Sequence, residues 1–247
     1  MADQSIKTEV RIDPLIGAVE IKITARIEDE DLILDYLKRS KEEPETRTIY
    51  FFDTPDLGLF EAGVVLRARK RPGEDDSTVK LRPVDPAKIP INWVKTEGFE
   101  IEMDRVGDRE VISAKLGSLQ KNGEIDDVIE GTRPLRKLFT KDQERLIEEF
   151  SPATITWDAL TPMGPINVSK WKVEFDEFDY EIVVERWKLP DKSDLVELSI
   201  KAEPGKAVQA SEDFLAFLAK RGLAIDGDQQ TKTRGALMFF KAGTGFD

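Results

Sequence analysis

The sequence predicts an α+β protein that is mainly antiparallel β, with strands closed into a barrel that has a charged interior and flanking helices. One observation is a set of basic residues at two-residue intervals in two neighbouring segments, namely Arg67, Arg69, Lys80 and Arg82. Successive side chains of a strand point to opposite faces of a sheet, so these four cations share one face and their apolar neighbours the other. Such a concentration of positive charge is most readily tolerated where a multiply anionic group is bound.

A second observation is that the same alternation of charge recurs in nearly every candidate strand. It includes Glu20 and Lys22, Glu100 and Glu102, Lys170 and Lys172, Glu181 and Glu185, and Glu197 and Lys201. For any one strand, a solvated polar face explains the pattern equally well. Repetition across many strands favours polar faces that converge on one interior. Lys170 and Lys172 either line this interior or lie outside it.

The elements of the first half follow in order from alternation and turn signals. Residues 17–28 alternate as a strand, and Asp29 or Asp31 then caps a helix with an apolar stripe at Leu32, Ile33, Tyr36 and Leu37. Strands follow at about 47–53, 63–70 and 77–83, separated by turns at 54–56 and 71–73. A proline-containing loop at 84–96 precedes a strand at about 97–104, whereas residues 6–12 are of uncertain structure.

The second half begins with a helical pattern over residues 109–150. Apolar residues recur there at helical spacing, first at Val111, Ile112, Leu116 and Leu119, then at Leu135, Leu138, Leu146 and Ile147. Strands are expected again at about 153–158, 166–175, 179–187 and 195–202, followed by helices near 209–221 and 230–241. We therefore expect a single domain over residues 1–247, with a helical insertion at about 105–150.

The composition excludes several kinds of catalytic site. The 247 residues include no cysteine and no histidine, which rules out disulfides, thiol nucleophiles, serine–histidine triads and histidine-ligated zinc. Any metal would have oxygen ligands, which favours Mg²⁺, Mn²⁺ or Ca²⁺. The net charge of −12 argues against a nucleic-acid partner, because binding to a phosphate backbone usually requires a basic balance.

No membrane partner is expected either. The N-terminal sequence has neither a basic start nor an apolar core, and no stretch approaches the length of a membrane span. We therefore expect a cytoplasmic protein. The segment at 105–150 has two open roles, as a lid or as the contact of a homodimer.

The block YFFDTPDLGLFEAGVVLRARKR, followed by TVKLRP and FEIE, resembles the CYTH family, also called triphosphate tunnel metalloenzymes. The resemblance extends from about Val19 to Lys232. It implies an eight-stranded antiparallel barrel that forms a tunnel, in which cations bind a triphosphate and acidic residues bind a divalent metal, Mg²⁺ or Mn²⁺. The family includes class IV adenylate cyclases, thiamine triphosphatases and inorganic triphosphatases.

The resemblance also implies roles for individual residues. The opening motif of the family, glutamate-x-glutamate-x-lysine, falls on Ala18, Glu20 and Lys22, and a late acidic pair falls on Glu197 and Ser199, so two acids are missing. The implied substrate-binding residues are Lys22, Arg67, Arg69, Lys80, Arg82, Lys201 and Lys232. The implied metal ligands are Glu20, Glu100, Glu102, Glu185 and Glu197.

The expected function is that of a metal-dependent enzyme acting on a small molecule that contains a triphosphate. Hydrolysis of inorganic triphosphate is the first choice, because no base-specific pocket is evident in the sequence. Hydrolysis of an organic triphosphate and class IV adenylate cyclase activity on ATP are alternatives. Because a hard cation is held largely by carboxylates, the two missing acids leave a further alternative, a degenerate module that binds polyphosphate or nucleotide without turnover.

Overall fold

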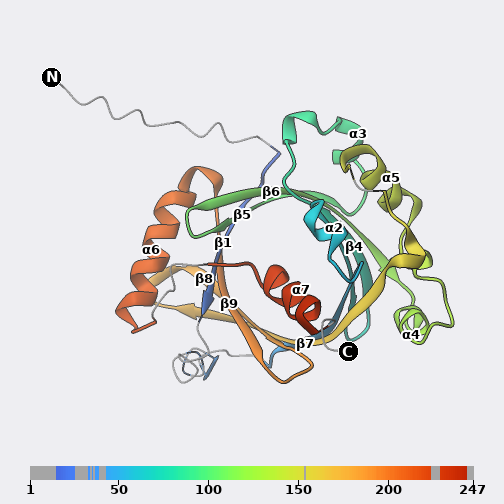
Figure 1. Cartoon of the computed structure of the whole chain (residues 1–247). Helices are drawn as coiled ribbons and strands as arrows, with labels where there is room; N and C mark the ends of the chain where they lie inside the picture. Colours follow the sequence, from blue (N-terminus) through green and yellow to red (C-terminus); the bar gives the residue numbers. More distant parts are fainter. Residues whose placement is uncertain are drawn as a thin grey trace.

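The strands of the chain close into a barrel, with helices arranged around it (Figure 1). The structure is a computed structural model, which describes residues 15–25, 33, 35, 37–38, 43–152, 154–223 and 229–243. Within these residues, the strands follow one another around the barrel in the order β1-β5-β6-β4-β3-β2-β7-β8-β9. The barrel closes where β9 pairs with β1.

The barrel has nine strands instead of the eight that the resemblance implied. They are β1 (Val19–Ala25), β2 (Glu45–Asp53), β3 (Val64–Lys70), β4 (Asp75–Leu81), β5 (Phe99–Val106), β6 (Arg109–Gln120), β7 (Thr161–Phe175), β8 (Phe178–Lys188) and β9 (Asp194–Ala202). Strand β1 pairs with β5 in parallel, and the other neighbouring pairs are antiparallel. The expectation of a closed, mainly antiparallel barrel is therefore confirmed, and its strand number is corrected.

Strand β6 corrects the helix that was expected over residues 109–120. It lies between β4 and β5 and pairs with β5 over residues 109–116 and with β4 over residues 114–120, so this backbone pairing outweighs the helical spacing of its apolar residues. The stretch also alternates, because Ile112, Ala114 and Leu116 pack in the apolar clusters outside the barrel whereas Lys115 lines its interior. This period of two was the more informative signal.

Other expectations change around β7 and at the N-terminus. The strand expected at 153–158 is wrong, because residues 154–156 have no regular structure and Trp157–Ala159 forms the short 3-10 helix η4. The Trp157 ring packs against Phe139 with ring centres 5.4 Å apart, which holds this segment beside the helices. The segment at 6–12 and most of the helix expected near 29–37 lie outside the described residues.

Helices cover the outside of the barrel. They are α2 (Gly58–Glu61), α3 (Ile91–Val94), α4 (Glu124–Ile129), α5 (Lys141–Phe150), α6 (Ala207–Lys220) and α7 (Lys232–Gly243), with 3-10 helices η2 (Pro86–Lys88), η3 (Leu135–Leu138), η4 and η5 (Pro204–Lys206). Figure 1 shows α6 on one side, α3, α4 and α5 on the opposite side, and α7 across the opening of the barrel. None of the described helices is long and apolar enough to cross a membrane.

The helix α5 is fixed to the barrel through one buried glutamine. Its first turn is a capping box, in which the Thr140 hydroxyl accepts from the Gln143 N–H and the Gln143 side chain accepts from the Thr140 N–H. The Gln143 amide also donates to the carbonyl of Ser77 at 3.2 Å and to that of Leu116 at 2.9 Å. One side chain therefore links α5 to both β4 and β6.

Most apolar side chains of β1, β3, β4 and β6 face outward and are buried beneath the helices, whereas Ile49, Phe51 and Val65 line the interior. In β1, Val19, Ile21 and Ile23 are buried in one cluster with Phe214 and Leu218 of α6. The outward residues of β3, β4 and β6 form a second cluster with α5. Because strand side chains alternate, packing of one face against the helices directs the charged residues of the other face into the barrel.

Candidate functional site

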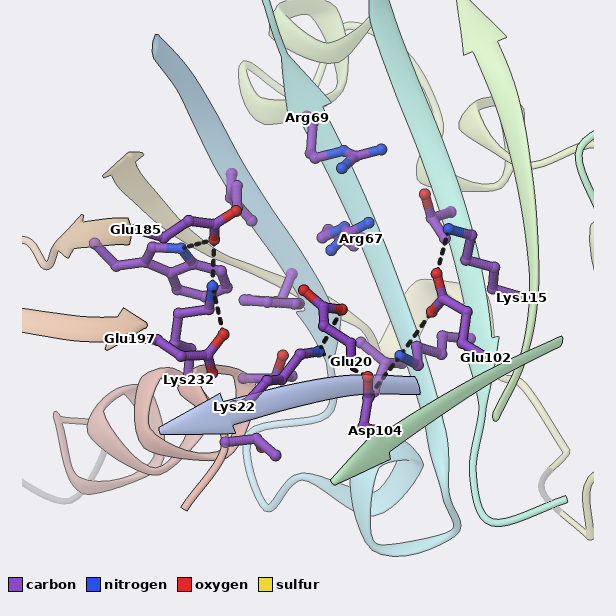
Figure 2. A pocket seen from close by; sticks show the side chains of 18 of the residues that line it. Glu20, Lys22, Arg67, Arg69, Glu102, Asp104, Lys115, Glu185, Glu197 and Lys232 are labelled. Carbon is purple, nitrogen blue, oxygen red and sulfur yellow. Dashed lines mark hydrogen bonds and ion pairs between the residues drawn. The ribbon is translucent and has the colours of Figure 1, made fainter. Parts of the chain in front are cut away.

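The inner face of the barrel encloses a cavity of about 190 Å³, which we call the tunnel (Figure 2). Its lining contains eight basic and five acidic side chains: Lys22, Arg47, Arg67, Arg69, Lys80, Arg82, Lys115 and Lys232, with Glu20, Glu102, Asp104, Glu185 and Glu197. The tunnel therefore has an excess of three positive charges in a chain whose net charge is −12. An excess of cations between low-dielectric walls attracts small anions.

Strands β3 and β4 direct the cations of the central block into the tunnel. The basic residues that line it from these strands, or directly after them, are Arg67, Arg69, Lys80 and Arg82. The residues that alternate with them are buried on the outer face, namely Leu66, Ala68, Val79 and Leu81. The predicted division of these strands into a basic and an apolar face is therefore observed.

Arg67 and Arg69 lie two residues apart on β3 but differ in their partners. The Arg69 Nε atom donates to both carboxylate oxygens of Asp76 at 3.0 Å. Arg67 has no ion pair within the described part of the chain, and its buried Nε atom has no hydrogen bond. Burial and the neighbouring charge of Arg69 lower the pKa of Arg67 to about 9. A largely buried guanidinium without a partner is unfavourable until an anion binds it.

Arg82 is a second arginine that forms no ion pair with a carboxylate of the described residues. Burial lowers its pKa, and the charge of Asp104 offsets only part of this effect. Its guanidinium lies 5.6 Å from the centre of the Phe60 ring, and none of the described acids lies within ion-pair distance. Arg67 and Arg82 therefore offer donors to the tunnel that no carboxylate in the described part of the chain engages.

Asp104 of β5 lies at the centre of a group that we call the Asp104 cluster, formed by Glu20, Lys22, Lys80, Glu102, Asp104 and Lys115. The Lys22 Nζ atom lies 2.8 Å from Asp104 Oδ1 and 3.1 Å from Glu20 Oε2. The Lys80 Nζ atom lies 3.1 Å from Asp104 Oδ2 and 3.0 Å from Glu102 Oε2. Each of these two lysines therefore bridges two carboxylates.

Lys115 of β6 completes the Asp104 cluster. Its Nζ atom lies 2.5 Å from Glu102 Oε1 and 2.9 Å from Glu100 Oε2. Burial alone would raise the pKa values of Glu102 and Asp104, but the adjacent lysines lower both to about 2. These carboxylates are therefore fully ionised near neutral pH and are weak bases.

A second group of charges, which we call the Lys232 cluster, joins α7 to the barrel wall. Glu185 of β8 and Glu197 of β9 lie opposite each other in register, and Lys232 pairs with both, with its Nζ atom 2.9 Å from Glu197 Oε1. Arg47 donates to Glu185 Oε1. Lys232 and the Trp187 indole donate to Glu185 Oε2, the indole at 3.1 Å. Burial opposes ionisation, but Lys232 and Arg47 lower the pKa of Glu185 well below its usual range.

Two of the predicted site residues lie outside the tunnel. Glu100 and Lys201 line a neighbouring cavity of about 400 Å³, which we call the vestibule and which shares Glu20 and Glu102 with the tunnel. Ala18 also lines the vestibule, so the missing acid of the opening motif falls in this neighbouring cavity and not in the tunnel. The other predicted residues line the tunnel, whereas their roles stay predictions.

Lys170 and Lys172 of β7, whose direction the sequence left open, are not among the residues that line the tunnel. The Lys170 Nζ atom lies 3.3 Å from Glu45 Oε2, and the Lys172 Nζ atom lies 3.2 Å from Glu181 Oε1. The Lys172 side chain is 51% exposed. Because exposed pairs of this kind contribute little to stability, Lys172 is a suitable control position for the lysines of the tunnel.

Sequence reasoning missed three charged residues of the tunnel: Arg47, Asp104 and Lys115. Asp104 continues the two-residue spacing of Glu100 and Glu102 on β5, so it was detectable by extending the period of two. Arg47 shares its face of β2 with the apolar Ile49 and Phe51, so alternation of charge does not single it out. Lys115 was concealed by the helical interpretation of β6.

The acids of the tunnel do not fit a resident divalent metal ion. Mg²⁺ and Mn²⁺ bind oxygen ligands, and the resemblance implied Glu20, Glu185 and Glu197 among them. Each of these carboxylates is in an ion pair with Lys22 or Lys232. The residues described contain no group of three acidic side chains arranged to hold an ion. The carboxylate oxygens that a metal requires are therefore engaged by ammonium groups.

The barrel has the fold of solved structures that are candidate adenylate cyclases. One from Bacillus halodurans has a TM-score of 0.60 at 12% identity, with 88% of this chain and 96% of that chain covered. Another, from Hippeastrum, is described as having a dominant triphosphatase activity and has a TM-score of 0.60 at 14% identity, with 91% and 95% covered. At such low identity, the likeness shows the fold alone.

No protein-family model matches the sequence, and no curated protein matches it. The similarity therefore lies in the course of the backbone. Together, the closed barrel, its charged tunnel and the two similar structures show that the chain has the tunnel-barrel fold of the CYTH type.

Proposed function

We propose that the protein binds a small molecule with a triphosphate in the tunnel and hydrolyses one of its phosphoric anhydride bonds. The observation that supports this most is the excess of tunnel cations, with Arg67 and Arg82 unpaired among the described residues. A terminal phosphate has up to two negative charges near neutral pH, so a whole triphosphate has roughly four. A ligand of this charge matches the cationic excess better than a single phosphate does.

The two kinds of cation in the tunnel suit different parts of this task. An arginine presents a planar fork of N–H donors that fits two oxygens of one phosphate, whereas a lysine acts as a point charge. Arg67 and Arg82 offer forks that none of the described carboxylates engages. Lys22 and Lys80 each bind two carboxylates, so one contact can be exchanged for a phosphate oxygen while the other remains.

The residues of the tunnel support hydrolysis mainly through position and charge. Phosphoryl transfer passes through a loose transition state, for which positioning and electrostatic stabilisation supply most of the catalysis. The pKa values of Glu102 and Asp104, lowered to about 2, make these carboxylates poor acceptors for a proton from water. A requirement for Mg²⁺ or Mn²⁺ stays a prediction from the sequence.

The test is a product assay on purified protein. Inorganic triphosphate, thiamine triphosphate and ATP are each supplied with Mg²⁺, Mn²⁺ or EDTA, and phosphate, pyrophosphate and cyclic AMP are measured. We expect release of phosphate, its loss in Arg67→Ala and Arg69→Ala, and its retention in the control Lys172→Ala. Turnover of none of these substrates would contradict the hydrolase. Formation of cyclic AMP with pyrophosphate would show a cyclase instead.

A second candidate function is binding of a triphosphate without turnover. The observation that favours it is the pairing of Glu20, Glu185 and Glu197 with lysines, which leaves no ready site for a catalytic metal. In this case calorimetry detects binding of triphosphate, the assay detects no product, and Lys80→Ala weakens binding.

A homodimer formed through the segment at 105–150 is a separate proposal, which light scattering of the purified protein tests.

A further inference from the structure

Two lysines of the tunnel occupy the positions between carboxylates at which a divalent cation would bind. Lys22 lies between Glu20 and Asp104, and Lys232 lies between Glu185 and Glu197 (Figure 2). In both cases the two carboxylates come from different strands, as they would in a metal site. Each ammonium supplies positive charge and several donors to the oxygens that a hard cation would otherwise bind.

Displacing these lysines by a metal would be unfavourable. The side chains of Lys22 and Lys232 are only 16% and 12% exposed. An ammonium that lost its carboxylates at such a position would remain in the tunnel with little water and no partner. A metal must therefore bind strongly enough to compensate for an unpaired buried cation as well as for its own dehydration.

The sequence also lacks the acids that would strengthen a metal site. Ser199 lies opposite Lys22 in the register between β1 and β9, and its hydroxyl donates to Glu20 at 3.3 Å. A serine at this position adds no negative charge beside Lys22. Ala18, the other position at which the resemblance expects an acid, lines the vestibule. The lysines are therefore balanced by the carboxylates present, and a divalent ion has no additional acid to bind.

We propose that the tunnel binds triphosphate as the free anion, and that Lys22 and Lys232 take the place of a divalent cation between the carboxylates. The inference rests on the proposed function for the identity of the ligand, but it does not require turnover. Three excess positive charges of the tunnel balance most of the roughly four negative charges of a triphosphate without any metal.

The first experiment uses the unmodified protein. Isothermal titration calorimetry measures the Kd of inorganic triphosphate in excess EDTA and in excess MgCl₂. We expect binding in EDTA that is at least as tight as in Mg²⁺, because Mg²⁺ neutralises part of the charge that the tunnel recognises. A lower Kd in Mg²⁺ than in EDTA overturns the inference. Absence of binding in both buffers overturns it together with the proposed function.

The second experiment tests, with Mn²⁺ alone, whether Lys232 keeps a divalent cation from binding between Glu185 and Glu197. Electron paramagnetic resonance of Mn²⁺ measures how much of the ion the ligand-free protein binds. We expect no retention of Mn²⁺ by the unmodified protein and measurable retention by Lys232→Met, in which Glu197 loses its ammonium partner. The same variant should bind triphosphate about tenfold more weakly in EDTA, because Glu197 is then no longer neutralised and repels the anion. The control Lys172→Met should leave both quantities unchanged.

The outcomes separate this inference from the proposed function. Tight binding in EDTA without turnover of any substrate supports the inference and contradicts the hydrolase. Binding and turnover that both require Mg²⁺ support the hydrolase and overturn the inference. Retention of Mn²⁺ by the unmodified protein also overturns it. The comparison of EDTA with Mg²⁺ needs no variant, so it stays decisive if Lys232→Met fails to fold.

Discussion

Replacement of Arg67 by methionine should stabilise the ligand-free protein while weakening its binding of triphosphate. Burial and the charge of Arg69 lower the pKa of Arg67 from 12.5 to about 9. One pKa unit corresponds to about 1.4 kcal/mol, so this shift represents about 5 kcal/mol of unfavourable energy for the charged side chain. Replacing buried charges by apolar groups of similar volume stabilises proteins by about 1–4 kcal/mol. We expect a gain of about 1–2 kcal/mol in the free energy of unfolding, because Arg67 keeps some exposure.

Arg69→Met provides the matched comparison, with the opposite sign. Arg69 donates to both oxygens of Asp76 at 3.0 Å, and the Asp76 side chain is only 6% exposed. Removal of one partner of a buried ion pair costs about 3–5 kcal/mol. Arg71 remains 3.2 Å from Asp76 and keeps part of the compensation, so we expect a loss of about 2–3 kcal/mol. Two arginines on one face of one strand should therefore change stability in opposite directions.

Urea denaturation followed by tryptophan fluorescence measures both effects, in a buffer without phosphate or sulfate so that no anion fills the tunnel. For a chain of this length, 1 kcal/mol also shifts the Tm by about 2–4 °C. Calorimetry with triphosphate should show weaker binding for both variants. If Arg67→Met destabilised the protein as much as Arg69→Met does, the Arg67 guanidinium would not be an unfavourable group, and the reasoning from its missing partner would be refuted.

Three further predictions concern the rest of the barrel. Stability should decrease as the pH falls from about 4.5 to about 2, because the folded-state pKa values of Glu102 and Asp104 are lowered to about 2 and the stability they contribute is lost as each is protonated. Urea denaturation midpoints measured across this pH range give the dependence of stability on pH, which should be weaker in the double variant Glu102→Gln, Asp104→Asn. Gly63→Ala should destabilise the protein by more than about 1 kcal/mol and weaken triphosphate binding, because Gly63 has a φ of 79° and a Cβ atom would lie 2.3 Å from the Arg82 carbonyl oxygen. If Gly63→Ala left the Kd of triphosphate unchanged, the substitution would not displace the Arg82 side chain. Gln143→Leu should cost about 1–3 kcal/mol without changing the Kd of triphosphate, and hydrogen exchange should show that α5 loses its protection first.

Local alternation predicts the strands whose two faces differ in chemistry. In β3, Arg67 and Arg69 face the tunnel while Leu66 and Ala68 are buried, and the period of two is therefore unambiguous. In β6, apolar residues fit both a helical and a strand spacing, and the pairing with β4 and β5 decides between them. The parallel pairing of β1 with β5 joins strands far apart in the chain and has no local signature.

The sequence predicted most of the charged residues of the tunnel, but not which of them form ion pairs with one another. Which carboxylate meets which lysine depends on strand order around the barrel. Lys22 reaches Asp104 because β1 lies beside β5, and Lys232 reaches Glu197 because α7 lies against β9. The expectation of a metal site followed from the resemblance to the CYTH family, whereas the ion pairs that engage its acids are a property of the folded barrel.

These ion pairs also determine which cations are available to a ligand. Asp104 has two ammonium partners, so it keeps one if Lys80 turns toward a phosphate. Glu197 has Lys232 as its one ion-pair partner in the described structure, so releasing Lys232 would leave a buried carboxylate unpaired. Lys232 should therefore act by neutralising Glu197, whereas Arg67 should bind the phosphate directly. It follows that Arg67→Met should weaken triphosphate binding more than Lys232→Met does, and calorimetry on the two variants in EDTA measures this order. The reverse order would place the phosphate chain against the Lys232 cluster.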